Sequence, residues 1–274
     1  MWPRTRIIDP GFIREHEAEH NEFWALWHSL YPIYREIYPT MNRSFYQDSI
    51  YEKFSDTEKS DFDILVCGAA DEDMLKLLDG ITGKDSKTER CNITLIDFCQ
   101  VALGRNQHYA NERGMKIKFV YEDILKYNCK EKYDIIVSDG FIDYFNDEKK
   151  KELLHKWKSL LRDEGIVITT APILRLKGKI PLDIYKEASL CVESLKKSSN
   201  PLWAVLHYQR LKKTCSGLTT KYGENKPFGK QEAFFDICNG SGLSVKYFEH
   251  FLDYKHIPWS WYNIILKKPV RAAS

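Results

Sequence analysis

The stretch Asp-Phe-Asp-Ile-Leu-Val-Cys-Gly-Ala-Ala-Asp-Glu, residues 61–72, indicates the fold of this chain. Its first half contains a short apolar run, which is typical of a strand buried on both faces. A turn of one glycine and two alanines follows. Next comes a segment with Met74, Leu75 and Leu78 on one face, which predicts a helix that ends at Gly80. The stretch therefore predicts a strand, a tight turn of small residues and a helix.

The same alternation of strands and helices continues downstream. Further strands are predicted at residues 91–97, 116–121, 133–138 and 165–170, and further helices at residues 100–113 and 147–161. Such alternation is typical of crossover units that build a parallel sheet covered on both faces. The last two strands, predicted at 243–250 and 261–267, need no helix between them and indicate an antiparallel pair at the sheet edge. We predict an open, mostly parallel α/β sheet of about seven strands.

Residues 1–58, which precede the first strand, differ from the rest of the chain. They are rich in tryptophan and tyrosine, and Pro32 and Pro39 interrupt an otherwise helical pattern. We predict a helical, aromatic cap over residues 1–58 and a main domain over residues 59–274.

Residues 172–240, between the fifth and sixth strands, are far longer than an ordinary connection of a few residues. Within them, residues 172–231 carry 12 lysines and arginines against 4 acids, which is a net charge of +8. Because the whole chain carries only +2, the remainder carries about −6. We predict a basic helical insert that serves as a lid over the substrate, and its charge favours an anionic partner.

Composition narrows the class of protein. With 274 residues, 43% hydrophobic and 29% charged, the chain can bury a sizeable core, and its composition excludes disordered and collagen-like classes. No apolar run is long enough to span a bilayer, and the first residues lack the pattern of a secretory signal. The seven cysteines are scattered without a Cys-x-x-Cys pair, which favours free thiols in a reducing compartment. We expect a cytoplasmic protein that is not associated with a membrane.

Candidate binding residues follow each of the first four strands, because ligands of open α/β sheets bind at the carboxyl ends of the strands. Small residues after the first strand let a ligand approach the backbone at a helix N-terminus. An acid at the end of the second strand can accept hydrogen bonds from a ribose diol. The candidates, in chain order, are Gly68, Ala69, Ala70, Asp97, Phe98, Glu122, Asp123, Ile124, Ser138, Asp139 and Phe141.

In order and spacing these residues resemble the class I S-adenosylmethionine-dependent methyltransferases, over roughly residues 60–175 and 240–268. The resemblance implies a Rossmann-like fold, with the final antiparallel strand pair as a further mark of the family. It also implies S-adenosylmethionine as the cofactor and S-adenosylhomocysteine as the product. No bound metal is expected, although Asp139 and Asp143 are the two acids that a catechol-type metal site would use.

The same resemblance assigns the candidates to parts of the cofactor. The turn from Gly68 to Ala70 would lie against the methionine part, and Asp97 would bind the ribose with Phe98 beside the adenine. An acid after the third strand, Asp123 with Glu122 before it, would meet the adenine amino group, and Ile124 would pack on the ring. The loop that holds Ser138, Asp139 and Phe141 would line the site near the transferred methyl group.

Two features depart from the family pattern. Where the family has Gly-x-Gly-x-Gly, residues 68–72 read Gly-Ala-Ala-Asp-Glu and keep only the first glycine. Glu72 at the third position is expected to alter how the helix N-terminus meets the cofactor. A non-catalytic scaffold with a methyltransferase-like fold is therefore an alternative.

Two other motifs give weaker evidence about function. His16 and His20 match a His-Glu-x-x-His zinc pattern, but no third ligand follows at the expected spacing, so a solvated helix face is the better interpretation. After the fourth strand, Ser-Asp-Gly-Phe at residues 138–141 differs from the motifs of the amino-methylating and C5-methylating nucleic-acid enzymes of this fold.

Candidate acceptor residues come from the cap, the insert and the loop after the fourth strand. His207 is the candidate general base, with Tyr144 as a second candidate catalytic residue. The residues predicted to contact the acceptor are Tyr38, Arg43, Tyr46, Trp203 and Tyr208. For each aromatic residue, packing between helices is the alternative.

The sequence predicts an enzyme that moves a methyl group from S-adenosylmethionine to an oxygen or nitrogen atom of a small organic acceptor. The basic insert favours an acceptor that carries a carboxylate or phosphate, or one attached to an acidic carrier protein. An RNA or protein methyltransferase that uses the insert as its binding surface is the runner-up. The oligomeric state is not indicated.

Overall fold

The computed structural model describes residues 41–56, 59, 61–82, 91–174, 228–253 and 259–269, all within one compact unit of the chain. Residues 1–40 of the predicted cap and residues 175–227 of the predicted insert lie outside the described residues. The predicted lid role of the insert and the zinc-like motif at residues 16–20 therefore stay predictions.

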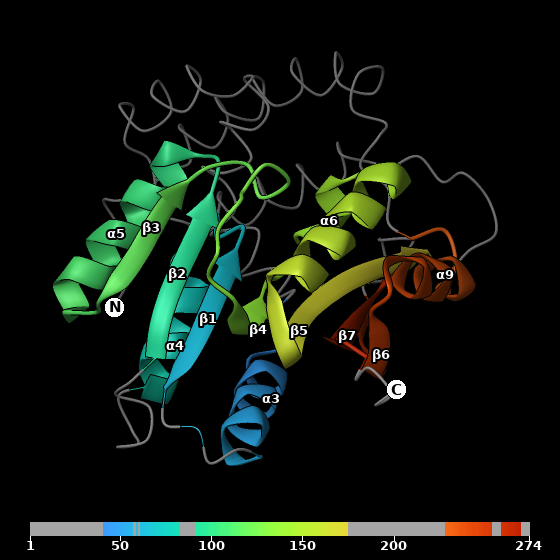
Figure 1. Cartoon of the computed structure of the whole chain (residues 1–274), viewed down its shortest axis with the longest axis horizontal. Coiled ribbons are helices and arrows are strands. Elements are labelled where there is room, and N and C mark those ends of the chain that lie inside the picture. The colour runs from blue at the N-terminus through green and yellow to red at the C-terminus, as the bar shows by residue number, and fades with distance from the viewer. Residues whose placement is uncertain are drawn as a thin grey trace, which may run out of the picture. The chain divides into compact units, whose positions relative to one another are not determined.

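A seven-stranded sheet organises the described residues, in the order β3-β2-β1-β4-β5-β7-β6 (Figure 1). Strands β3 to β5 run parallel along this order, and β7 pairs antiparallel with both β5 and β6. The predicted Rossmann-like sheet is thereby confirmed. The strands are β1 (Phe62–Cys67), β2 (Cys91–Asp97), β3 (Ile117–Tyr121), β4 (Tyr133–Val137), β5 (Leu161–Leu174), β6 (Ser244–Asp253) and β7 (Trp259–Lys267).

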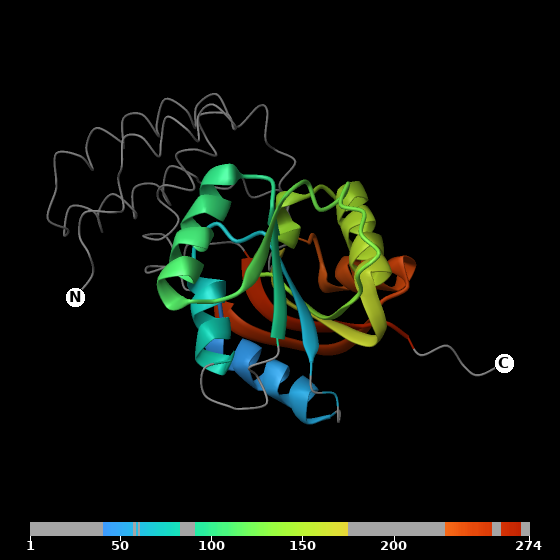
Figure 2. The ribbon, with the colours of Figure 1, turned by 60° about the vertical axis from the view of Figure 1, so that its left-hand side comes forward.

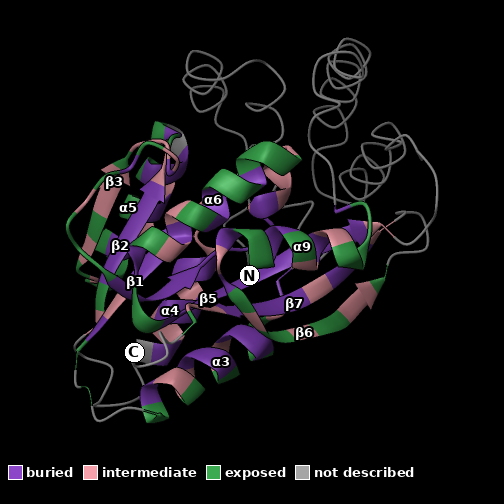
Figure 3. Ribbon diagram, turned by 45° about the vertical axis from the view of Figure 1, so that its right-hand side comes forward, coloured by how far each residue is buried: buried purple, intermediate pink, exposed green. Residues whose placement is uncertain are grey.

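Helices cover both faces of this sheet (Figure 2). Side chains of α3 (Arg43–Ser55), α4 (Asp73–Thr82) and α5 (Gln100–Arg113) belong to one core cluster, and those of α6 (Asp147–Leu160) and α9 (Gln231–Ser241) to the other. Successive strand residues alternate between the clusters, since side chains of a strand point to opposite faces. In β1, for example, Ile64 lies in the first cluster and Leu65 in the second. Buried residues, drawn in purple in Figure 3, lie along the central strands and on parts of the helices.

Single capping residues set the ends of several helices. The side chain of Asn42 accepts a hydrogen bond from the amide of Phe45 and caps α3, and Asn146 caps α6 in the same way. Gly114 follows α5 in the left-handed conformation at φ +68°, so the helix ends at residue 113 as the sequence predicted. A 3-10 turn, η1 (Ile142–Tyr144), connects the loop after β4 to α6.

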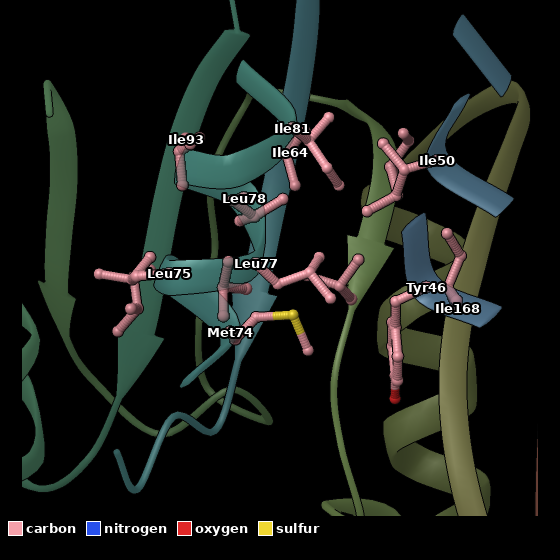
Figure 4. Packing of buried hydrophobic residues seen from close by; sticks show 14 of the residues in the cluster. Tyr46, Ile50, Ile64, Met74, Leu75, Leu77, Leu78, Ile81, Ile93 and Ile168 are labelled. Atoms are coloured by element: carbon pink, nitrogen blue, oxygen red, sulfur yellow. The ribbon is translucent and has the colours of Figure 1, made fainter. Parts of the chain in front are cut away.

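Helix α3 lies in the predicted cap, yet it packs into the core of the main domain. Tyr46 and Ile50 are fully buried and point toward the sheet, on the same side as Ile168 of β5 (Figure 4). From α4, Met74 and Leu78 join this cluster. Residues 43–55 are therefore an integral layer of the sheet domain, whichever arrangement residues 1–40 adopt.

Two sequence-based boundaries differ from the structure. Gly80 does not end α4, because the helix continues to Thr82 and places Ile81 in the core with no exposed surface. The segment predicted as an insert begins and ends in regular structure, since residues 172–174 continue β5 and residues 231–240 belong to α9. The final antiparallel pair lies at the edge of the sheet as predicted, with β6 as the outermost strand.

Among the described residues, the helices are too short or too polar to cross a bilayer. The described cysteines, Cys67, Cys91, Cys99, Cys129 and Cys238, are free thiols as predicted. Cys191 and Cys215 lie outside the described residues.

Candidate active site

The turn after β1 requires a glycine at its first position. Gly68 has φ +70°, which side chains disfavour, and a Cβ there would lie 2.2 Å from Cδ2 of Phe141. Phe141 comes from the loop after β4, so the glycine permits close contact between two of the predicted site segments. The predicted residues Gly68 and Phe141 therefore meet in the structure.

Hydrogen bonds from two neighbouring elements fix the small-residue turn. The amide of Gly68 donates to the carbonyl of Ile96 (3.2 Å), and the amide of Ala69 donates to Oδ2 of Asp97 (3.0 Å). From α5, Asn106 Nδ2 donates to the carbonyl of Ala69 (2.9 Å), and Arg105 Nη1 donates to the carbonyl of Ala70 (3.3 Å). The turn is thus held from β2 on one side and from α5 on the other.

Sequence reasoning missed Arg105 and Asn106. They follow the turn by more than thirty residues and sit within a helix whose sequence shows no binding motif. Asn106 is fully buried, and a buried amide in a helix that packs beside the turn is the one signal that could have indicated it.

Asp97 ends β2, where the sequence predicted a ribose-binding acid. Its Oδ2 accepts from Ala69, and its Oδ1 accepts from the amide of Cys99 (2.9 Å). These two hydrogen bonds fix the orientation of the Asp97 carboxylate at the end of β2. The adjacent residue Phe98 is 50% exposed.

Cations balance the charge of Glu72, the main departure from the glycine pattern. Lys76 Nζ lies 3.1 Å from Oε1 of Glu72 and 3.3 Å from Oδ1 of Asp73. Burial lowers the pKa of Arg105, and the charges of Glu72 and Asp71 oppose that shift, so Arg105 lies in their field. Arg43 of α3 also pairs with Asp73 at 3.4 Å. The negative charge that Glu72 brings in place of the family's glycine is therefore offset by nearby lysine and arginine side chains.

The acids after β3 also lie at the carboxyl edge of the sheet. The amide of Glu122 donates to the carbonyl of Asp97 (3.1 Å), which brings the loop after β3 against the end of β2. Asp123 Oδ1 accepts from the amide of Leu125 (3.0 Å) and so shapes its own turn. Ile124 is 4% exposed and packs in the second core cluster.

The loop after β4 is anchored to β5 by side-chain hydrogen bonds. Ser138 Oγ lies 2.8 Å from Thr169 Oγ1, and Thr170 Oγ1 donates to Oδ1 of Asp139 at 2.7 Å. The amide of Gly140 in turn donates to Thr170 Oγ1 (3.0 Å). Ser138 and Asp139 are nearly fully buried, so their side chains fix the loop against β5. In the same loop, the Phe141 ring packs near Tyr144 and edge-on to Phe145.

Of the residues predicted to contact an acceptor or to act in catalysis, the structure describes Arg43, Tyr46 and Tyr144. The buried hydroxyl of Tyr46 donates to the carbonyl of Ser138 at 2.5 Å, which ties α3 to the loop after β4. Arg43 is exposed at the start of the same helix. The other predicted acceptor and catalytic residues, Tyr38, Trp203, His207 and Tyr208, lie outside the described residues.

Asp143, at the start of η1, has a carboxyl group with unusual surroundings. The residue keeps some exposed surface, but its Oδ1 has none and lacks a hydrogen-bond partner. Burial of the carboxyl raises its pKa to about 7; Asp139 adds to the shift, while its own backbone amide and Lys150 oppose it. Within the described part of the chain, no group of three or more acids, histidines and cysteines could hold a metal ion.

Comparison with known proteins gives one match along the sequence and several in structure. A family model described as a methyltransferase domain matches residues 80–165, and a comparison with curated proteins finds no match. The chain resembles an S-adenosylmethionine-dependent methyltransferase from Clostridium acetobutylicum ATCC 824, at 13% identity and a TM-score of 0.54, over 90% of this chain and 98% of that one.

Two further solved structures are similar. One is the N-methyltransferase NodS from Bradyrhizobium japonicum WM9 with S-adenosyl-L-homocysteine, at 13% identity and a TM-score of 0.51, over 89% of this chain and 99% of that one. The other is magnesium protoporphyrin IX methyltransferase (ChlM) from Synechocystis PCC 6803, at 12% identity and a TM-score of 0.53, over 95% of this chain and 100% of that one. At these identities the likenesses show the fold alone, and it is the fold that the sequence predicted.

Proposed function

We propose that this chain, which has a methyltransferase domain in the class I fold, is an enzyme that transfers a methyl group from S-adenosylmethionine to a small organic acceptor. The observation that carries the proposal is the fixed turn after β1. Its backbone is held by Asp97, Arg105 and Asn106 despite the loss of two family glycines. A turn that no longer bound a ligand would not need hydrogen bonds from both β2 and α5 to fix its backbone.

The cofactor would lie along the carboxyl edge of β1 to β4. The turn from Gly68 to Ala70 would meet its methionine part, and the carboxylate of Asp97 would accept hydrogen bonds from the ribose hydroxyls. The exposed ring of Phe98 would stack on the adenine, whose amino group would donate to Asp123. Two of the similar structures, NodS and ChlM, contain bound S-adenosylhomocysteine, which supports this choice of cofactor.

The reaction would be an in-line displacement at the methyl carbon. The acceptor atom forms a bond to that carbon while the carbon–sulfur bond breaks, and the electron pair stays on sulfur. The protein has to align the two reactants, exclude water and accept a proton from the acceptor. The sequence predicted His207 as the general base and Tyr144 as a second catalytic residue.

The acceptor would be a small molecule methylated on oxygen or nitrogen. Magnesium protoporphyrin IX methyltransferase is named for a small-molecule acceptor and NodS is named as an N-methyltransferase, which supports this class. The net charge of +8 over residues 172–231 favours an acceptor with a carboxylate or phosphate, or one on an acidic carrier protein. The same charge is the feature that an RNA-modifying enzyme would use, and steep weakening of acceptor binding by salt would favour that second function.

Calorimetric titration with S-adenosylmethionine and S-adenosylhomocysteine tests the proposal. We expect both to bind to the wild-type protein, and Asp97→Ala to abolish detectable binding while the protein stays folded by circular dichroism. Asp97 orients the turn and supplies the ribose acceptor, so both contributions are lost together.

A matched control is Asp63→Ala, at the opposite end of the neighbouring strand β1. Asp63 bonds Asn92 and Arg162, away from the turn, so this variant should keep the wild-type affinity. Wild-type affinity in Asp97→Ala would show that the ribose assignment is wrong. Failure of the folded wild-type protein to bind either compound would favour the scaffold alternative.

A further inference from the structure

The aromatic ring of Phe141 lies directly against the turn after β1. A Cβ on Gly68 would lie 2.2 Å, 2.7 Å and 2.8 Å from three carbons of this ring, Cδ2, Cε2 and Cγ. Those distances are shorter than van der Waals contact, so not even a methyl group fits between the Gly68 backbone and the ring. One side of the turn is therefore covered by a single aromatic side chain from the loop after β4.

Hydrogen bonds from other elements hold the same turn in place. The amides of Gly68 and Ala69 donate to β2, and the carbonyls of Ala69 and Ala70 accept from side chains of α5. Several hydrogen bonds would have to break before this backbone could change its shape. A ligand that lies against Gly68 therefore gains its space more easily by displacing the Phe141 ring than by moving the turn.

The ring of Phe141 can move while the backbone beside it stays fixed. The amide of the preceding residue, Gly140, donates to Thr170 Oγ1 (3.0 Å), and Cη2 of Trp261 lies 3.3 Å from the place that a Cβ on Gly140 would take. Phe141 itself is half-buried, and its ring packs edge-on to Phe145 with 5.2 Å between the ring centroids. Rotation about χ1 to another staggered position would uncover Gly68 and leave the loop anchored to β5.

We propose that the Phe141 ring is a gate, which closes the cofactor site of the free protein and rotates away before S-adenosylmethionine binds. The inference rests on the proposed function and concerns access to the same site. The ring and the methionine part of the cofactor compete for contact with Gly68, so molecules with the ring rotated away are the ones that bind. The observed affinity is then the affinity of the open form multiplied by the fraction of molecules that are open.

A ring that formed a wall of the occupied site would respond differently to truncation. Removing a wall takes contacts away from the bound cofactor, so the complex dissociates faster and the affinity falls. Removing a gate leaves the bound complex unchanged and raises the fraction of open molecules, so the association rate constant and the affinity both rise. The two roles of Phe141 thus predict changes in affinity of opposite sign.

The variant Phe141→Ala tests the gate with S-adenosylhomocysteine as the probe. Calorimetry gives the affinity, and stopped-flow mixing followed by tryptophan fluorescence gives the rate constants of association and dissociation. We expect Phe141→Ala to bind about tenfold more tightly than the wild-type protein, as it would if about one tenth of the wild-type molecules were open. The whole gain should appear in the association rate constant, and the dissociation rate constant should stay within about twofold.

Phe235→Ala is the matched control. Phe235 is a half-buried residue of α9 whose ring contacts Phe234 and Phe248, so its truncation removes a similar amount of aromatic packing away from the turn. The affinity and both rate constants of this variant should stay within about twofold of the wild-type values. If circular dichroism shows that Phe141→Ala does not fold, Phe141→Leu, which keeps a branched apolar side chain without the ring, provides the same comparison.

An unchanged or lower affinity in the folded Phe141→Ala protein, or a gain that appears in the dissociation rate constant alone, would overturn the gate. The same titrations separate the two proposals. If the wild-type protein binds S-adenosylhomocysteine and Phe141→Ala binds it no more tightly, the gate alone is contradicted. If neither folded protein binds it, the proposed function is contradicted, whereas binding by Phe141→Ala alone would support both proposals.

Discussion

Asn106 shows how a single side chain can replace what a glycine pattern usually provides. Its amide Nδ2 donates to the carbonyl of Ala69 and to the carbonyl of Ala102 in its own helix, so it links α5 to the turn after β1. Both carbonyls are then oriented by a fully buried group that has no room to move. Ala70 and Glu72 stand where the family has glycines. Hydrogen bonds that fix the backbone are therefore the main way in which this turn keeps a shape that can bind a ligand.

Replacing Asn106 with leucine, which has a similar size and no donor, should weaken S-adenosylmethionine binding about tenfold. The expected loss is about 1.4 kcal/mol, because one hydrogen bond that orients the turn is removed. Calorimetry on the folded variant measures it, with Asn92→Ala, which removes an exposed amide at the start of β2, as the control. A lower melting temperature with unchanged affinity would mean that Asn106 supports the fold but not the site.

At the scale of elements, α3 is the helix whose role differs most from its sequence context. Phe45, Ser49, Tyr46, Ile50 and Phe54 recur at helical spacing and are buried against the sheet. Through the Tyr46 hydroxyl, the helix also supports the loop after β4. The helix therefore links core stability to the position of the candidate site.

The variant Ile50→Ala should lower the free energy of unfolding by about 2–5 kcal/mol, the usual cost of emptying a fully buried site. Asp48→Ala, on the exposed side of the same helix, should change it by less than about 0.5 kcal/mol. Equilibrium unfolding in urea compares the two. A small loss in Ile50→Ala would mean that α3 belongs to a separable cap.

These elements also show why part of the structure could be predicted from sequence. Strand and helix periods, and the glycine at residue 114, act over a few neighbouring residues, and they predicted the sheet, α5 and the final strand pair correctly. Gly80 failed as a helix end because Ile81 gains burial in the core, a tertiary effect that no local pattern contains. The contacts of Asn106 and the environment of Asp143 likewise depend on packing between distant segments.

At the scale of the whole domain, the carboxyl edge of the sheet is rich in acids. Acids follow β1 at residues 71–73, β2 at residue 97, β3 at residues 122 and 123, and β4 at residues 139 and 143. Arg43, Lys76 and Arg105 balance those near β1. The edge as a whole should therefore attract positive charge more than negative charge.

S-adenosylmethionine carries one positive charge more than S-adenosylhomocysteine, at its sulfonium. Raising NaCl from about 0.05 M to about 0.5 M should thus weaken S-adenosylmethionine binding about threefold and S-adenosylhomocysteine binding less, because salt screens the edge. Paired calorimetric titrations at both salt concentrations measure the difference. Equal salt effects on the two compounds would contradict an electrostatic preference for the substrate form.

The place of β7 has a consequence for how the protein is made. The strand is inserted between β5 and β6, although it is the last of the seven in the chain. While a ribosome synthesises this chain, β5 emerges long before its partner, and one side of it stays unpaired until residues 259–267 have left the exit tunnel. Stop codons or fusion tags placed shortly before residue 259 would leave nascent chains in which one side of β5 has no strand partner. Such an exposed strand edge favours aggregation, and chaperones would have to shield it.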